Sequence, residues 1–193
     1  MARPPRFDTD QLLDAAVRLA AAGGPAAVTM SAVAQAVGAP SGSVYHRFAG
    51  RTALLAEVWL RTVERFQQGY LAVLATEADP RRAARAGSRY VVHWSRDNTE
   101  EACLLLYGAA DFGRADWSEG HTARADAGNG RVFATLGGLA GALGATDEQA
   151  RDRVAVALVD LPLSVVRRHL RAGAPLPRHA EDLAEECTAA LLG

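Results

Sequence analysis

The segment from Thr29 to Phe48, TMSAVAQAVGAPSGSVYHRF, constrains the fold most, because it reads as two short helices separated by a tight turn. Thr29 is placed to cap the first helix with its hydroxyl, and apolar residues follow at helical spacing up to Val37. Gly38 stands where a helix end requires a residue that tolerates positive φ, and Pro40 suits the start of a new helix. We therefore predict one helix that ends near residue 37 and a second that begins near residue 40.

The second of these helices divides into a buried face and an exposed face. Val44 and Phe48 lie one turn apart, so both can pack against Val33 and Val37. The other positions are small, polar or basic and include no carboxylate: Ser41, Gly42, Ser43, Tyr45, His46 and Arg47. The major groove of DNA admits a helix of this kind, so the segment predicts a helix-turn-helix that reads DNA.

The exposed residues suggest different contacts with DNA. The first three are expected to enter the groove, because glycine allows close approach and a serine hydroxyl can meet a base edge. Tyr45 can offer its hydroxyl to a phosphate or serve only as a structural tyrosine, and we favour the phosphate contact. His46 and Arg47 favour phosphates over base edges. The sequence does not indicate which bases are chosen.

The same residues resemble the TetR family of one-component transcriptional regulators over about residues 7–60. Two positions depart from the family pattern, since Pro40 stands where a serine often lies and Ala39 replaces a larger aliphatic residue. The resemblance rests on a Thr-capped helix with Val33-Ala34, the turn Gly38-Ala39, the run Gly42-Ser43-Val44-Tyr45 with Phe48 after it, and Arg51 opening the next helix.

The resemblance and the helix signals together predict an all-α protein with two domains. Residues 1–50 are expected to form a three-helix DNA-binding domain with a basic arm, and residues 51–193 a helical domain for effector binding and dimerisation. Asp8 and Gln11 predict a capping box for the first helix. A long helix begins at Arg51, and further helices are expected over residues 81–96, 99–112, 121–143 and 181–192, with one starting at 147. Thr99 and the pair Thr146 and Gln149 are expected caps, and Pro162 predicts a kink or break. No stretch alternates with period two, so no strand is expected.

Four more positions complete the set predicted to touch DNA. Arg51, at a helix N-terminus, is expected to bind one phosphate, and Thr29 lies at the edge of the helix pair. Arg3 and Arg6 either reach the minor groove or belong to a tail without contacts.

Composition limits the function without defining it. The 193 residues carry a net charge of −1, and five arginines against three aspartates give residues 1–51 a charge of +2, which leaves −3 for the rest. That asymmetry is too small to indicate DNA binding alone. All 21 basic residues are arginine. Cys103 and Cys187 have no neighbours at metal-ligand spacing, so no metal, cofactor or disulfide is expected. No signal peptide or membrane span is apparent, and we expect a cytoplasmic protein.

Residues 52–193 carry no motif of comparable strength. Most of their aromatic residues are expected to be core, but the resemblance implies that a few line an apolar effector cavity. The candidates are Trp59, Phe66, Tyr90, His93, Trp94, Tyr107, Phe112 and Trp117.

The last helices carry an apolar stripe that covers either their own core or a partner. The resemblance implies that the last two major helices pair with their copies in a four-helix interface. The candidate dimer residues are Val154, Leu158, Leu161, Val165, Leu183, Cys187 and Leu191.

The expected function is that of a ligand-responsive regulator, most simply a repressor that binds a near-palindromic operator as a homodimer and is released by a small-molecule effector. An activator and a regulator without effector are alternatives within the DNA-binding class. An enzyme or carrier with a structural N-terminal module is the alternative from another class. The chain has no GxSxG motif, P-loop or metal cluster, so no catalytic residue is assigned.

Overall fold

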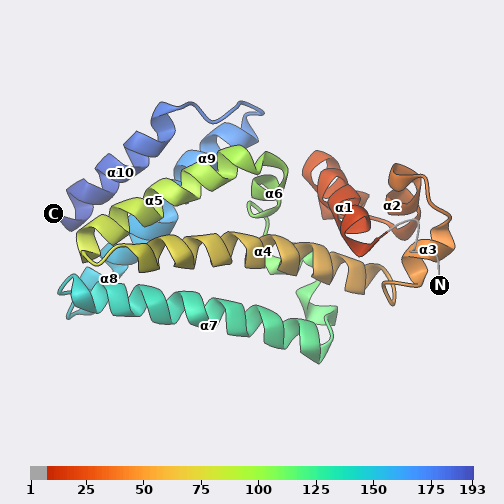
Figure 1. Ribbon diagram of the computed structural model, residues 1–193, viewed down its shortest axis with the longest axis horizontal. Coiled ribbons are helices and arrows are strands. Elements are labelled where there is room, and N and C mark those ends of the chain that lie inside the picture. Colours follow the sequence, from red (N-terminus) through yellow and green to blue (C-terminus); the bar gives the residue numbers. More distant parts are fainter. Residues whose placement is uncertain (1–7) are drawn as a thin grey trace. The chain divides into compact units, whose positions relative to one another are not determined.

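The computed structural model describes residues 8–193, and every regular element in this range is helical (Figure 1). This confirms the all-α prediction. The chain forms two compact units: residues up to Val63 with Cys103–Asp126, and Glu64–Ala102 with Ala127–Gly193. Two long helices, α4 (Arg51–Thr76) and α7 (Glu119–Ala142), contribute residues to both units. The predicted division of function at residues 50 and 51 stays a prediction.

The described part of the chain contains no helix with the length and apolarity that crossing a bilayer requires.

The first unit begins with short helices whose ends follow from local sequence. The Asp8 carboxylate accepts the N–H of Gln11 at 2.7 Å, and the Gln11 side-chain oxygen accepts the N–H of Asp8 at 3.3 Å. This confirms the predicted capping box. Gly24, with φ of 72°, ends the helix that Asp8 begins. The elements are α1 (Thr9–Gly23), a 3-10 turn η1 (Pro25–Ala27), α2 (Met30–Val37) and α3 (Ser41–Tyr45).

An apolar core joins α1, α2 and α3 to the first half of α4. Each helix contributes at least one side chain with no exposed area: Leu12, Val33, Val44 and Leu54. Trp59 packs on Phe112 with ring centroids 5.0 Å apart, and Trp117 Nε1 donates to the Phe112 carbonyl at 3.0 Å. Burying one such side chain contributes about 1.5–3 kcal/mol. Burial of this core therefore dominates the stability of the first unit.

The segment after helix α5 (Pro80–Asp97) differs from the prediction of one helix from Thr99 to about Phe112. The structure has α6 (Thr99–Leu104), followed by two 3-10 turns, η2 (Ala109–Phe112) and η3 (Arg114–Asp116). Thr99 does not cap α6, because its hydroxyl donates to the Arg96 carbonyl at 3.0 Å. The Asp111 carboxylate accepts the N–H of Gly108 at 2.7 Å, and this local turn replaces the predicted helix.

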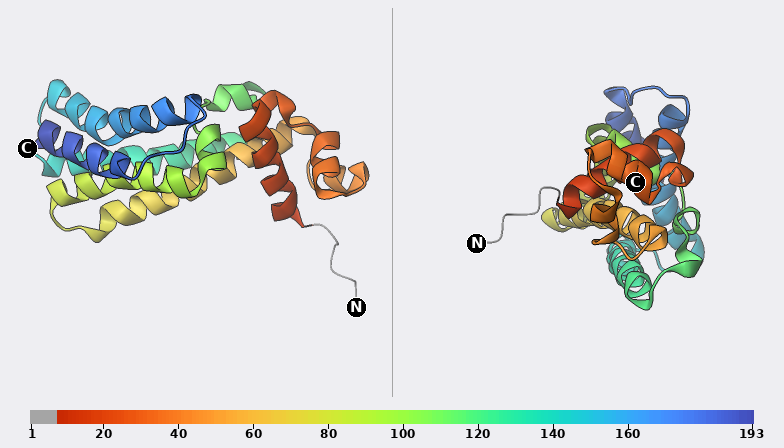
Figure 2. Two further views of the ribbon diagram at one scale, coloured as in Figure 1. Left: turned by 90° about the horizontal axis from the view of Figure 1, so that it is seen from above. Right: turned by 90° about the vertical axis from the view of Figure 1, so that its right-hand side faces the viewer.

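The second unit is built around α5 (Pro80–Asp97) and α10 (His179–Leu192), which lie side by side (Figures 1 and 2). Asp79 caps α5 by accepting the N–H of Arg82 at 2.8 Å. The predicted cap formed by Thr146 and Gln149 is wrong by one residue. Asp147 caps the next helix instead, by accepting the N–H of Ala150 at 2.7 Å, and aspartate is at least as good a cap as threonine. The remaining elements are α8 (Glu148–Ala155), a π-helical turn η4 (Val156–Asp160) and α9 (Leu161–Arg171).

Pro162 does not break the helix but accompanies a change in its hydrogen-bond register. The N–H of Leu161 donates to the carbonyl of Val156, five residues earlier. It therefore does not donate to the carbonyl of Ala157, which would be its partner in an α-helix. Pro162 has no N–H for the carbonyl of Leu158, its α-helical partner. Side chains from two other helices take these carbonyls: the Thr188 hydroxyl donates to Ala157 at 3.0 Å, and the Tyr70 hydroxyl donates to Leu158 at 3.3 Å.

Tyr70→Phe is expected to destabilise the protein by about 1–2 kcal/mol, because the Leu158 carbonyl loses its buried donor. In a Pro162→Ala background the cost of the same change should be smaller, since the substituted residue supplies a main-chain N–H to that carbonyl. Chemical denaturation of the four proteins in a double-mutant cycle measures the difference. Equal costs of Tyr70→Phe in both backgrounds would contradict this account of the π turn.

Candidate nucleic-acid interface

The ends of α2 are fixed by the residues predicted to fix them. Thr29 caps the helix through its hydroxyl, which accepts the N–H of Ala32 at 3.0 Å. Gly38 has a φ of 68°, and its N–H reaches the carbonyls of Ala34 and Gln35. A left-handed conformation favours glycine, so Gly38 sets the sharp turn into α3. Both predicted end signals are confirmed.

The inner face of α3 anchors it to the rest of the unit. Pro40 precedes the helix with a φ of −59°. Val44 is fully buried, and Phe48, one turn later, is 4% exposed. Both belong to the core that also contains Val33. The opposite face of α3 must therefore point away from the protein.

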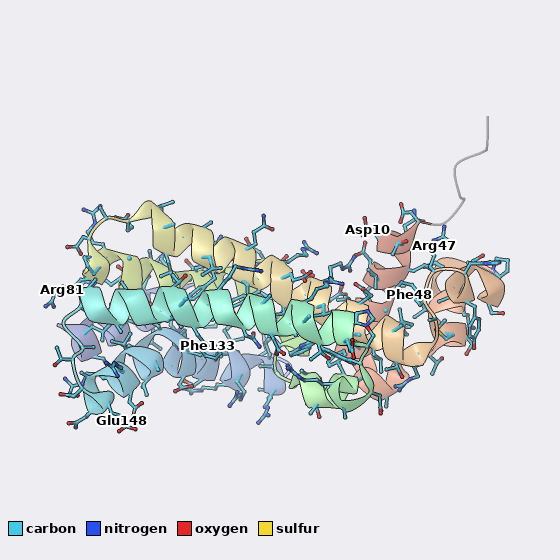
Figure 3. The ribbon with its side chains drawn as sticks, turned by 90° about the horizontal axis from the view of Figure 1, so that it is seen from below. Asp10, Arg47, Phe48, Arg81, Phe133 and Glu148 are labelled. Atoms are coloured by element: carbon cyan, nitrogen blue, oxygen red, sulfur yellow. The ribbon has the colours of Figure 1, made fainter. Side chains whose placement is uncertain are left out.

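The predicted DNA-contact residues occupy that outer face. Ser41, Gly42 and His46 are exposed, and Tyr45 is 61% exposed although it is a large ring. Ser43 and Arg47 are half-buried, and Arg47 Nη1 donates to the Ser43 carbonyl at 3.2 Å, which holds that side chain along the helix. Figure 3 marks Arg47 beside the buried Phe48, where the chain leaves α3.

No aspartate or glutamate occurs between Thr29 and Arg51, so the electrostatic character of this surface is set by donors and cations. Among residues 8–193, no atom outside the chain neighbours of Gly42 and its own helix backbone lies within 4 Å of the position that a Cβ on Gly42 would take. The surface is thus open at its middle and offers hydroxyl, imidazole and guanidinium groups around it. An anchored helix pair with such an outer face defines a helix-turn-helix DNA-binding protein.

Comparison with known proteins identifies the family of this domain. Residues 12–58 match the family model described as bacterial regulatory proteins, tetR family. The resemblance to the TetR family is thereby confirmed over these residues, which form a TetR-type helix-turn-helix domain. No curated protein sequence matches the chain.

Solved structures of TetR-family regulators share the fold along nearly the whole chain. One from Rhodococcus RHA1 has a TM-score of 0.76 at 17% identity and covers 97% of this chain and 98% of its own. PfmR from Thermus thermophilus has a TM-score of 0.69 at 23% identity and covers 96% of each chain. FadR from Bacillus subtilis, solved with stearoyl-CoA, has a TM-score of 0.73 at 13% identity and covers 96% of this chain and 98% of its own.

Of the three other arginines predicted to contact DNA, the structure describes only Arg51. Arg51 donates from Nε to the Val28 carbonyl and from Nη2 to the Pro25 carbonyl, both at 2.8 Å. Two N–H groups of Arg51 are therefore engaged in hydrogen bonds within the protein. Arg3 and Arg6 lie outside the described residues.

The aromatic residues predicted for an effector cavity fall into two separate groups. In the first unit, Phe112 has no exposed area and Trp117 is 8% exposed, so both belong to the core, and their role in ligand binding stays a prediction. They were indistinguishable from cavity residues in the sequence because both kinds of site select large apolar rings. Trp59 and Tyr107 flank Phe112, with ring centroids 5.0 Å and 6.3 Å from it.

In the second unit, Phe66 lies at the centre of the other group. Its ring centroid is 5.8 Å from Tyr90, 5.1 Å from Trp94 and 5.8 Å from Tyr70. Burial raises the pKa of the Tyr90 hydroxyl, which donates to the Phe66 carbonyl at 3.4 Å.

His93 does not join the aromatic rings. Its side chain is 56% exposed and lies 3.3 Å from Glu181 and 3.5 Å from Asp97. Glu181 is buried and also pairs with Arg96 and Arg89. His93 is therefore part of an ion network between α5 and α10, which a sequence pattern does not reveal because Glu181 lies 88 residues further along the chain.

Two of the predicted dimer residues are core residues of their own chain. Val154 is 4% exposed and Leu158 has no exposed area, because both pack with Ala84 and Ala140 in one core cluster. Their burial is therefore explained within one chain, and their role as dimer contacts stays a prediction. Leu161, Val165, Cys187 and Leu191 are half-buried, whereas Leu183 is 43% exposed. Val156, which was not predicted, is 42% exposed in the π turn, where the register change alters the helical face.

A pocket of about 420 Å³ in the second unit was missed by sequence reasoning. It lies between α4 and α7, where Gln67 Nε2 donates to Asn129 Oδ1 at 3.1 Å. A Cβ on Gly128 would stand 2.6 Å from Gln67 Oε1, so this glycine allows the close approach. The glycine was the only signal in the sequence, because the lining residues resemble an ordinary solvated helix surface: Glu64, Gln67, Gln68, Leu71 and Arg131.

Gly42→Ala is expected to weaken DNA binding about tenfold while the stability stays equal or rises by up to about 1 kcal/mol, because alanine favours a helix and meets nothing in the protein. The added methyl group stands on the surface that must approach the groove. Fluorescence anisotropy with labelled duplex and thermal unfolding measure the two effects.

Gly38→Ala is the matched control for that variant. Alanine at the positive φ of residue 38 is expected to lower the stability of the protein by about 1–2 kcal/mol, whatever the substitution does to DNA affinity. Wild-type DNA affinity in Gly42→Ala would show that this face of α3 does not pack against the duplex.

Proposed function

We propose that the protein is a ligand-responsive transcriptional regulator, most simply a repressor that binds a near-palindromic operator as a homodimer. The observation that carries the proposal is the outer face of α3, which is exposed, free of carboxylates and anchored from behind by Val44 and Phe48. Residues 1–50 are assigned to DNA binding, and residues 51–193 to effector binding and dimerisation. No catalytic step is required.

The DNA contacts follow from the position of each side chain on that face. Ser41, Gly42 and Ser43 form the first turn of α3 and are assigned to the base edges in the major groove. Tyr45 and His46 are exposed at its end and are assigned to phosphates. Arg47 adds a cation on the same side, which attracts the duplex regardless of sequence.

A homodimer is supported by exposed apolar side chains near the chain's end. Leu183 on α10 and Val156 in the π turn are 43% and 42% exposed, although leucine and valine are usually buried. A twofold axis would bury each against the second copy and would place two copies of α3 on one operator. The near-palindromic operator follows from that symmetry.

An apolar effector is supported by the ring cluster of the second unit and by one related structure. Phe66 and Tyr90 are half-buried, so part of each side chain remains exposed and can contact a ligand. FadR from Bacillus subtilis was solved with stearoyl-CoA, whose long acyl chain is apolar. A ligand that binds one conformation better than the other shifts the protein towards it and so changes operator affinity.

Selection of bound duplexes from a random pool tests the proposed function. We expect a near-palindromic winner whose affinity falls steeply as salt rises, because several phosphates are neutralised on each half-site. Titration of that winner at two salt concentrations gives the slope. Folded protein that enriches no duplex would contradict the proposal.

Leu183→Glu is expected to shift the protein from dimer to monomer at micromolar concentration, because it places a charge in a desolvated apolar contact. Light scattering coupled to size exclusion measures the mass. Phe133→Glu is the matched control, since Phe133 is 72% exposed on α7, outside the proposed interface (Figure 3). Loss of the dimer in the control alone would place the interface elsewhere.

A further inference from the structure

The helix formed by α8, η4 and α9 is buried along one side. Its buried residues recur every four positions: Val154, Leu158, Pro162 and Val166. Two residues turn an α-helix by about 200°, so the series offset by two positions lies on the opposite side. The members of that series are exposed, and we call them the ridge: Glu148, Asp152, Val156, Asp160, Ser164 and Arg168. Figure 3 marks Glu148, where the ridge begins.

Charge changes sign from one end of the ridge to the other. Three exposed carboxylates form its acidic end: Glu148, Asp152 and Asp160. Three exposed arginines lie on or beside its basic end: Arg167, Arg168 and Arg171. Arg151 and Arg153 precede and follow Asp152 directly, about 100° from it around the helix, so they lie off the ridge. The ridge itself is therefore polar along its length, with opposite charges at its two ends.

The charges of the ridge are not balanced inside the chain. Within the part of the chain that the structure describes, none of these carboxylates and arginines forms an ion pair. The helix macrodipole favours an acid in the first turn and cations in the last turn, which accounts for Glu148, Arg168 and Arg171. Asp152 and Asp160 lie beyond the first turn, so the macrodipole does not explain them.

A second copy of the chain can balance both ends at once. A twofold axis across the helix makes the copies antiparallel, so the acidic end of each ridge faces the basic end of the other. An axis along the helix would place like charges opposite each other. Val156, which is 42% exposed, and the small Ser164 stand between the two ends and permit close contact. Ser164 Oγ donates to the Leu161 carbonyl at 2.7 Å, so its donor already has an acceptor.

We propose that the ridge recognises an antiparallel copy of itself, and that its order of charges selects the dimer partner. This inference rests on the proposed function, because it requires the homodimer. Charges across an interface set orientation and partner choice more than they set affinity, since wrong partners place like charges together. The ridge accepts a chain with the same order of charges and excludes a chain with the reverse order.

The first experiment uses a swapped variant in which the two ends exchange their charges: Asp152→Arg, Asp160→Arg, Arg168→Glu and Arg171→Glu. The swapped protein should form homodimers, because antiparallel pairing again places opposite charges together. Mixed with isotope-labelled wild type, it should form mixed dimers about tenfold less often than random mixing gives, because like charges meet at both ends. Native mass spectrometry counts the three dimers. Random mixing would overturn the proposal, and an excess of mixed dimers would do so by indicating parallel pairing.

The second experiment uses Asp152→Arg with Asp160→Arg alone, which keeps the arginines that suit the end of the helix. The ridge of this variant carries arginines at both ends, so its dimer should dissociate about tenfold more readily than the wild-type dimer. High salt should narrow the difference, because it screens exposed charges. Light scattering over a dilution series measures dissociation, and circular dichroism checks the fold. A folded variant that dimerises like the wild type would contradict the proposal.

Arg151→Glu with Arg153→Glu is the matched control, because it reverses two charges of the same helix that lie off the ridge. This control should dimerise and should mix with the wild type at random. Wild-type protein that is monomeric at micromolar concentration would refute the proposed homodimer. A dimeric wild type that mixes at random with the swapped variant would refute the ridge alone.

Discussion

The structure depends most on the burial of one helix, α4, in two cores. Its first half fills the core under the helix-turn-helix through Leu54 and Val58, and its second half enters the core of the other unit through Tyr70 and Leu74. Each buried aliphatic or aromatic side chain removes apolar area from water and supplies more stabilisation than any surface ion pair of the chain. A single helix therefore contributes side chains to both cores, and neither core is complete without it.

Local chemistry explains why much of this fold could be predicted from the sequence. Thr29, Gly38 and the pair Asp8 and Gln11 act on main-chain groups within four residues, so their spacing in the sequence already contains their geometry. The inner face of α3 follows in the same way from Val44 and Phe48. The same reasoning failed at Thr99 because a hydroxyl that can cap a helix can equally donate to the previous one, as it does to Arg96.

The remaining features depend on partners that are distant in the chain. Arg51 meets carbonyls more than 20 residues away, and the Tyr70 hydroxyl meets a carbonyl 88 residues away. Phe112 and Leu158 show the related limit for apolar residues. Helical periodicity says that such a side chain points inward, but it does not say whether it meets its own core, a ligand or a second copy. Only the packing of the whole unit distinguishes these cases.

The π turn before Pro162 has a consequence for how such a sequence can change. The π register leaves the Ala157 carbonyl to Thr188 of α10, and the proline leaves the Leu158 carbonyl to Tyr70 of α4, so positions far apart in the chain share the hydrogen bonding of one turn. Loss of the proline would give the Leu158 carbonyl a main-chain donor in place of the Tyr70 hydroxyl, whereas loss of that hydroxyl first would pass through a less stable protein. Substitutions at these two positions are therefore expected to follow an order, with residue 162 changing before residue 70.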